Sequence, residues 1–339
     1  MKKILFLSVV AAALLLGSCG DSTPGGSMLP NVSGSSGEIL VVMDRAEWEG
    51  ELGEKIRNVL ADPIDRLPQP EPEFDLVNVT PGAFSKLYLT HRNVVMIDKK
   101  VENGAKVTFL EDTYALSQLI INIRGENKED IMGLLDEEGQ AIVNKINIAE
   151  RDRWIKVYKR SVNSVIFNKL RDKYGMNIHM PSNFSLDVEE PGFMWFSYET
   201  PTTTQSILIH YFDLDGGNYF NRDSIESIRN RMTRRNVKGP SDGSYMTIED
   251  RVPIRYRQFR FRNRNYAEMR GLWTLEKGFM GGPFVNLVTE DEVNNRFVMV
   301  DAFVYAPNEE KRELLRQVEA IIYTISFPDD KEVVVTPGK

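Results

Sequence analysis

The sequence predicts an α+β protein with two α/β-type domains joined by a long helical segment, the second domain being mainly antiparallel sheet with packed helices. Strand-like and helix-like segments alternate in the first third of the chain, whereas strand-like segments dominate after residue 175. Between them, residues 127–174 contain no proline and carry apolar residues at helical spacing. A chain of 339 residues is long enough for two such domains.

The first nineteen residues have the organisation of a bacterial lipoprotein signal peptide. Two lysines precede an apolar run over residues 4–16, which is too short to span a bilayer. The run ends in LGSC, in which small residues precede Cys19, the single cysteine of the chain. The sequence therefore predicts a signal peptide over residues 1–19 and lipidation of Cys19, with palmitate among the acyl chains. An ordinary signal peptide with an incidental cysteine is the alternative.

Lipidation would place the protein on a membrane of the cell envelope. Two or three acyl chains on one cysteine give stable anchoring. Residues 20–37 are rich in Gly, Ser and Pro, so we expect a flexible tether there. No run of acidic residues follows Cys19, which favours an anchor in the outer membrane that faces the periplasm.

An N-terminal α/β domain is predicted over residues 38–150. It opens with the continuous apolar run 39–43, typical of a strand buried on both faces. The segments expected after it are a helix over 46–60, a strand over 74–79, a helix over 81–89, and strands over 94–97, 106–110 and 119–123. This alternating order indicates parallel pairing. Asn103-Gly104 predicts a hairpin turn that leads into residues 106–110.

The helical segment of residues 127–174 joins the two domains. Its apolar stripe changes phase around residues 147–153, so we predict two consecutive helices, or one bent helix, rather than a straight rod. The border between the domains is placed in this region, at residue 150.

A C-terminal α+β domain is predicted over residues 151–328, with a loose charged tail over 329–339. A polar helix is expected over residues 223–236, and an amphipathic helix after Pro307. The expected strands cover 178–180, 184–188, 193–198, 206–212, 244–249, 254–262, 266–275, 284–288 and 297–305.

The second domain contains a strongly basic window. Residues 229–270 hold twelve Arg or Lys against four acids, about +8, in a chain whose net charge is -7. Five arginines nearly alternate along one predicted strand and just beyond it: Arg255, Arg257, Arg260, Arg262 and Arg264. Alternation would put them on one face, and the three-residue step from Arg257 to Arg260 implies a bulge or a change of face.

These five arginines are the predicted binding residues. Guanidinium groups suit phosphate and carboxylate, so the partner would be an anionic envelope component or an acidic protein. Nucleic acid is not expected as a partner of an envelope protein. The alternative is a solvated strand face paired with acids on the next strand, such as Glu268 and Glu276.

Two other motifs resemble catalytic or metal sites. Residues 239–243, GPSDG, match the pattern of a hydrolase nucleophile around Ser241, but all three histidines come earlier in the chain and the composition is typical of a turn. Residues 213–223, DLDGGNYFNRD, are rich in oxygen ligands without the spacing of a calcium loop. We therefore predict no catalytic residue, no cofactor and no metal site.

Residues 280–284, MGGPF, carry a family resemblance. With GLW at 271–273, FVYAP at 303–307 and Lys311-Arg312, they resemble domain-of-unknown-function family 4837 of Bacteroidota lipoproteins, over nearly the whole mature chain. The resemblance implies a lipidated envelope protein and supplies no activity, substrate or catalytic residue. Gly281-Gly282-Pro283 itself predicts a tight turn, or else a backbone edge left bare for a ligand.

The function expected from these features is a non-catalytic binding or assembly module, held at the membrane through Cys19. The alternative is a hydrolase or transferase that acts on an envelope polymer through carboxylates the sequence does not locate. A deep cleft with two converging carboxylates would favour the enzyme, and a shallow basic sheet face would favour the module.

Overall fold

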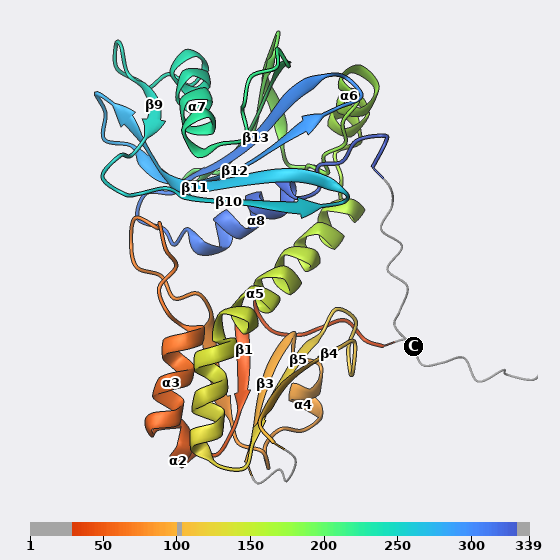
Figure 1. The fold of residues 1–339 in the computed structure, drawn as a ribbon, viewed down its shortest axis with the longest axis vertical. Coiled ribbons are helices and arrows are strands. Elements are labelled where there is room, and N and C mark those ends of the chain that lie inside the picture. Colours follow the sequence, from red (N-terminus) through yellow and green to blue (C-terminus); the bar gives the residue numbers. More distant parts are fainter. Residues whose placement is uncertain (1–28, 100–103, 331–339) are drawn as a thin grey trace, which may run out of the picture.

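The computed structural model describes residues 29–99 and 104–330. It confirms the α+β class, with a five-stranded sheet in the N-terminal part, an eight-stranded sheet in the C-terminal part and a long helix between them (Figure 1). Cys19 lies outside the described residues. Among the described helices, none is long and apolar enough to cross a membrane.

The five-stranded sheet has the order β2-β1-β3-β5-β4. The predicted parallel pairing is confirmed for β1–β2, β1–β3 and β3–β5, and β4 runs antiparallel to β5. The strands are β1 Glu38–Val42, β2 Asp75–Val79, β3 Asn93–Lys99, β4 Lys106–Glu111 and β5 Leu119–Gly125. Strands β3 and β4 do not form the predicted hairpin, because β3 pairs with β1 and β5, and β4 pairs with the free edge of β5. Asn103, in the predicted turn, lies outside the described residues.

Helices cover the two faces of this sheet unequally. The helix predicted over residues 46–60 is divided at Gly50 into α2 (Arg45–Trp48) and α3 (Glu51–Leu60). Helix α3 and the long helix α5 bury the apolar face that contains Ile39 and Val41. On the opposite face, Phe84 packs against Val42, Val94 and Ile120, and the short helix α4 (Lys86–Leu89), which buries no residue, follows.

Helix α5 spans Lys128–Arg160 without a break, and α6 spans Ser164–Tyr174. Two consecutive helices are therefore present, but the phase change at residues 147–153, interpreted as a break or a bend, lies inside α5, and the break lies at 161–163, where Asn163 caps α6. The phase of the stripe changes because the packing partner changes. Ile142 and Ile146 pack in the first core, and Tyr158 packs in the second. The domain border predicted at residue 150 falls inside α5.

The eight-stranded sheet is antiparallel, in the order β10-β11-β12-β13-β8-β7-β6, with β9 paired to part of β11. Residues 178–180 form no strand. Helix α8 (Arg312–Ile322) and α6 pack on one face, and α7 (Arg222–Asn236) packs on the other (Figure 1). The strands are β6 Ser185–Glu190, β7 Phe193–Glu199, β8 Thr204–Asp213, β9 Tyr245–Ile248, β10 Arg255–Phe261, β11 Arg264–Glu276, β12 Gly281–Asp291 and β13 Arg296–Tyr305.

Polar contacts join the two parts of the chain at the first turn of α8. The carboxylate of Glu71, in the proline-rich loop before β2, accepts hydrogen bonds from the backbone amides of Lys311 and Arg312. The Arg312 guanidinium binds Asp75 at the start of β2, and Arg316 donates to the carbonyl oxygen of Glu73. Because Glu71, Arg312 and Arg316 are all buried, this junction holds the N-terminal sheet firmly against α8.

Candidate functional site

The five predicted arginines do not lie on one strand. Strand β10 ends at Phe261, Arg262 and Asn263 form a tight turn with φ of 49° and 64°, and Arg264 begins β11. Two consecutive residues with positive φ are what a two-residue hairpin turn requires, and Asn tolerates this region well. The strand predicted over residues 254–262 is therefore one residue too long at each end, and the single arginine face is wrong.

Four of the five arginines bind groups of the protein itself, and exposed Arg260 does so weakly, with Nη2 donating to the carbonyl oxygen of Asn263 at 3.3 Å. Arg257 Nε donates to Glu268 Oε1 at 2.9 Å, and Arg262 Nη1 donates to the carbonyl oxygen of Ile325 at 2.7 Å. Buried Arg264 binds both acids at the start of the predicted loose tail, Asp329 and Asp330. Arg255 and Arg260 are exposed. An anion-binding role for these two stays a prediction.

A hollow of about 500 Å³ lies beside this turn. Arg264 lines it, but its guanidinium also donates to the carbonyl oxygen of Glu290, so its hydrogen-bonding capacity is largely used. The residues that line the hollow are Phe220, Gln258, Phe259, Arg264, Asn265, Tyr266, Glu290 and Glu292. The hollow therefore has little uncompensated positive charge with which to bind an anion.

A buried charge network beneath β10 and β11 explains why Arg257 is bound internally. Glu268 also accepts hydrogen bonds from Arg270 and from the Tyr323 hydroxyl, and Arg270 binds Glu319 of α8 at 2.7 Å. Burial by itself would raise the pKa of Glu268, but Arg270 and Arg257 outweigh it and hold this pKa well below its usual range. The network therefore ties the edge of the sheet to α8.

Exposed basic residues besides Arg255 and Arg260 lie on α7. Arg231, Arg234 and Arg235 project from the outward face of this helix, and Lys238 follows just beyond its last turn. In the described residues, none of these four cations has a carboxylate within ion-pair distance. Arg231 donates to Ser227, and the Arg234 guanidinium stacks over the Tyr245 ring at 4.8 Å. We call these four residues the cationic face of α7.

A buried ion pair holds α7 on the sheet. Arg229, on the inward side of the helix, donates to both carboxylate oxygens of Asp301 in β13, at 2.6 and 3.2 Å. Its guanidinium also stacks over the Phe284 ring at 3.6 Å, and neither Arg229 nor Asp301 has any solvent exposure. Burial raises the pKa of Asp301, with Arg229 opposing it. The pair fixes which side of α7 faces outward.

Sequence reasoning found the basic window but did not single out the exposed cations of α7. The alternation on β10 drew attention to the strand, whereas the signal on α7 was the spacing of three arginines and one lysine at positions 231, 234, 235 and 238. Helical residues three and four apart share a face. Applied to the polar helix, this spacing would have located the cationic face.

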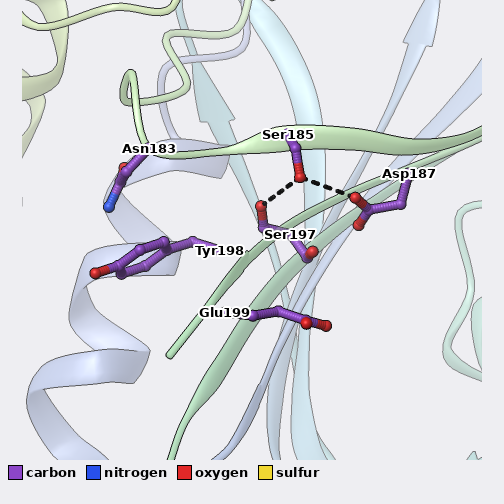
Figure 2. A pocket seen from close by; sticks show the side chains of 6 residues that line it. All are labelled: Asn183, Ser185, Asp187, Ser197, Tyr198 and Glu199. Carbon is purple, nitrogen blue, oxygen red and sulfur yellow. Dashed lines mark hydrogen bonds between the residues drawn. The ribbon is translucent and has the colours of Figure 1, made fainter. Parts of the chain in front are cut away.

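A polar hollow of about 340 Å³ lies at the β6–β7 edge of the sheet (Figure 2). The register of β6 shifts between Leu186 and Val188, and Ser185 Oγ donates to Asp187 Oδ1 at 2.9 Å. The lining residues are Asn183, Ser185, Asp187, Ser197, Tyr198 and Glu199. Two carboxylates, Asp187 and Glu199, line this hollow, as Glu290 and Glu292 line the hollow beside the β10–β11 turn.

The other sequence motifs form turns. Residues 239–243 connect α7 to β9, with the Ser241 carbonyl oxygen accepting from the amide of Ser244. In the loop before α7, Asp215 accepts hydrogen bonds from Gly217 and Tyr219, and Asn221 caps the helix. Across the described residues, no three His, Cys, Asp or Glu side chains gather in a metal-binding arrangement.

The Gly281-Gly282-Pro283 segment is strand, not the predicted tight turn. It begins β12, where Gly282 pairs with Trp273 of β11. The Trp273 indole donates to the carbonyl oxygen of Val304 at 3.1 Å. A Cβ on Gly282 would overlap that oxygen and crowd the indole nitrogen. Glycine is therefore required here by close packing.

Comparisons with known proteins identify domains but no activity. Residues 163–324 match a family described as a domain of unknown function, DUF4837, and residues 32–159 match another, DUF8532. The resemblance to family 4837 thus covers the C-terminal half and not nearly the whole mature chain. None of the curated proteins matches the sequence.

Solved structures show only remote likeness. LpqN, involved in cell envelope biogenesis of Mycobacterium tuberculosis, is 9% identical, with 44% of this chain and 82% of LpqN covered and a TM-score of 0.27. Human STARD10 is 8% identical, with 47% and 79% covered and a TM-score of 0.24. A protein from Bacteroides thetaiotaomicron is 14% identical, with 47% and 46% covered and a TM-score of 0.20.

With TM-scores this low, none of the three solved structures indicates a shared fold or function. The family matches stand by themselves. The chain therefore carries a DUF4837 domain over residues 163–324, preceded by a DUF8532 domain over residues 32–159.

Proposed function

We propose that this chain is a lipid-anchored protein of the cell envelope that acts as a non-catalytic binding or assembly module. Its anchor would be the lipidated Cys19, in an outer membrane and facing the periplasm. The partner would be an anionic envelope component or an acidic protein, and the contact surface would be the cationic face of α7.

The observation that carries this proposal is the absence of acid partners around Arg231, Arg234, Arg235 and Lys238 in the described residues. Like charges three and four residues apart on a helix destabilise it by about 0.2–0.5 kcal/mol per pair. The negative end of the helix offsets part of this cost for cations in the last turn. An anionic partner would remove the remaining repulsion and gain charge-assisted hydrogen bonds.

The junction at α8 supports an assembly role. Because Glu71, Arg312 and Asp75 hold the N-terminal sheet against α8, α7 is presented in a fixed orientation relative to the point where the chain leaves for its anchor. Figure 1 shows α7 on the side of the eight-stranded sheet remote from the five-stranded sheet. This arrangement would let the protein hold a partner at a distance from its own membrane anchor.

The anchor and the surface are tested separately. Wild-type protein should partition into detergent and carry acyl chains on its N-terminal peptide, and Cys19→Ser should abolish both. For the surface, Arg231→Glu with Arg234→Glu and Arg235→Glu should abolish co-purification of the partner. The matched control reverses three exposed cations that already have acid neighbours, Arg45, Arg171 and Lys173. Equal loss in both triple variants would contradict the assignment to α7.

The alternative is a hydrolase or transferase that acts on an envelope polymer, and we assign it to the hollow at the β6–β7 edge. Its two carboxylates would be Asp187 and Glu199, which line the hollow in Figure 2. Under this alternative, Asp187→Asn with Glu199→Gln would abolish turnover of an envelope glycan. Under our proposal, the same double variant retains partner binding.

A further inference from the structure

Exposed apolar side chains gather at one place on the N-terminal part of the structure. Within the described residues, eleven large apolar side chains are exposed, and five of them belong to β4, the loop after it and the neighbouring face of α5. These five are Phe109, Leu110, Tyr114, Leu116 and Ile148, with 39–45% exposure. Phe109 and Leu110 are adjacent on β4 and point to opposite faces of the sheet, so Leu110 lies apart from α5. We call the other four, Phe109, Tyr114, Leu116 and Ile148, the apolar patch. Gathered apolar exposure of this kind marks an interaction surface.

Contacts between α5 and the loop show that the patch is continuous. Lys145 binds Glu111 at the end of β4, and Lys156 donates to the Ser117 hydroxyl at 2.7 Å. Ile148 lies between these two lysines on the same face of α5, one turn from Lys145. Its exposed side chain therefore borders the loop that carries Tyr114 and Leu116.

The loop that carries Tyr114 and Leu116 is firmly held. The amide of Tyr114 donates to the Gln118 side chain at 2.9 Å, and Arg153 donates to the Ser117 carbonyl oxygen at 2.8 Å. Ala115, between the two exposed residues, is fully buried. The loop thus presents both apolar side chains outward in a fixed geometry.

The chain from the anchor enters the described structure at this patch. The amide of Leu116 donates to the carbonyl oxygen of Pro30 at 2.8 Å, and Asn31 forms a parallel bridge with Leu116. Part of the tether predicted over residues 20–37 therefore lies against the sheet. The nine residues 20–28 can span at most about 30 Å when fully extended. A lipid on Cys19 would keep Leu116 within that reach of the bilayer.

We propose that the apolar patch seats the N-terminal domain on the membrane that holds the anchor. The inference rests on the anchor in the proposed function. Phe109 and Leu116 would enter the boundary between head groups and acyl chains, and Tyr114 would keep its hydroxyl at the head groups. The rim supplies Lys156, whose ammonium group suits lipid phosphate. Seating turns a tethered protein into an oriented one.

A fluorescent probe at the patch tests the proposal on the full lipidated chain. Because Cys19 carries the lipid, a cysteine introduced by Leu116→Cys is the single free thiol and takes a nitrobenzoxadiazole dye. The protein is bound to vesicles of phosphatidylethanolamine and phosphatidylglycerol that contain nitroxide-labelled acyl chains. The matched control is Phe279→Cys, at a side chain that is 91% exposed in the turn between β11 and β12.

We expect the nitroxide lipids to quench the dye at position 116 roughly threefold or more, and to leave the dye at position 279 unchanged. A Tyr114→Asp substitution should reduce the quenching at position 116. If the protein floats with the vesicles but both dyes are quenched equally, the patch does not contact the membrane, whereas the Cys19 anchor is supported. No flotation would overturn both. If dye fluorescence at position 116 instead changes with protein concentration in the absence of lipid, the patch binds a second copy of the chain, which would contradict the proposal.

Discussion

The carboxylate of Glu71 accepts a hydrogen bond from the backbone amide of Arg312 at 2.8 Å, so a side chain of the N-terminal part caps the first turn of α8. Its other oxygen accepts from the amide of Lys311, also at 2.8 Å. The first turn of a helix leaves backbone N–H groups without partners, and the residue at the start of α8 supplies no capping side chain of its own. The stability of α8 therefore depends on the loop before β2.

Glu71→Ala should lower the free energy of unfolding by about 0.5–2 kcal/mol, the usual cost of losing a helix cap. It should also separate the unfolding of the two parts of the chain, which urea titration followed by circular dichroism would detect. The control is Glu54→Ala, an exposed glutamate on α3, expected to change stability by no more than about 0.5 kcal/mol. Equal effects of the two substitutions would contradict the capping role.

Arg229→Ala should destabilise the C-terminal domain by about 3–5 kcal/mol, because it leaves the buried Asp301 carboxylate without its partner. Arg229→Met combined with Asp301→Leu should recover much of that loss, since an apolar pair replaces the ion pair. Arg231→Ala, two residues away on the exposed side of α7, should leave stability nearly unchanged. Urea unfolding midpoints of the three variants test these stability changes. An unchanged midpoint for Arg229→Ala would contradict the claim that the Arg229–Asp301 pair holds α7 on the sheet.

Gly282→Ala should cost about 1–3 kcal/mol, since the added methyl group overlaps the Val304 carbonyl oxygen beside the Trp273 indole. Trp273 fluorescence should report the disturbance directly. Gly133→Ala is the matched control, because its Cβ meets nothing within 4 Å on α5. That substitution should stabilise the protein by about 0.5–1 kcal/mol through helix propensity. A stabilising Gly282→Ala would show that the close packing has been misassigned.

Acid should destabilise the protein through Glu268 and Glu319. Burial would raise both pKa values, but the neighbouring arginines outweigh it and lower them from the ordinary 4.5. The unfolded chain then binds more protons, so this stability is present above about pH 4.5 and is lost as the pH falls through the folded pKa values. Glu268→Gln should flatten that dependence in urea titrations at several pH values. An unchanged slope would contradict it.

Asp301 should contribute with the opposite sign. Burial raises its pKa in the folded state, so its contribution is present below its ordinary pKa of 3.8 and is lost as the pH rises through the folded value. The Arg229→Met variant should therefore lose stability as the pH rises toward neutral, and adding Asp301→Asn should remove that loss. A variant whose stability still falls there as before would exclude Asp301 as its source.

Local sequence patterns predicted helices and strands better than they predicted the tertiary contacts of these elements. The apolar run 39–43 and the parallel sheet were found because buried strands and alternating helices leave direct marks in sequence. The end of α5 was not located, because a change of packing partner shifts an apolar stripe as a helix break or bend would. The turn at Arg262-Asn263 lacks the usual glycine, and Gly282 is required by a contact with Val304, which lies 22 residues away in sequence.

The candidate sites depended still more on tertiary structure. The charge count located a basic window, but only the positions of Glu268, Asp329 and Asp330 show which arginines are bound internally. The apolar patch draws on β4, its loop and α5, which are far apart in sequence. Cys19, the feature that sequence predicts most directly, lies outside the described residues.

The measurement that tests the central claim most directly is site-specific photocrosslinking in cells. A benzoylphenylalanine in place of Ser227, exposed among the cations of α7, should give a discrete adduct with an acidic or otherwise anionic partner. The same group in place of Gln140, exposed on α5, should give none. The Ser227 adduct should disappear when Arg231, Arg234 and Arg235 are changed to glutamate. An adduct that persists in this variant, or that forms equally at position 140, would contradict the account.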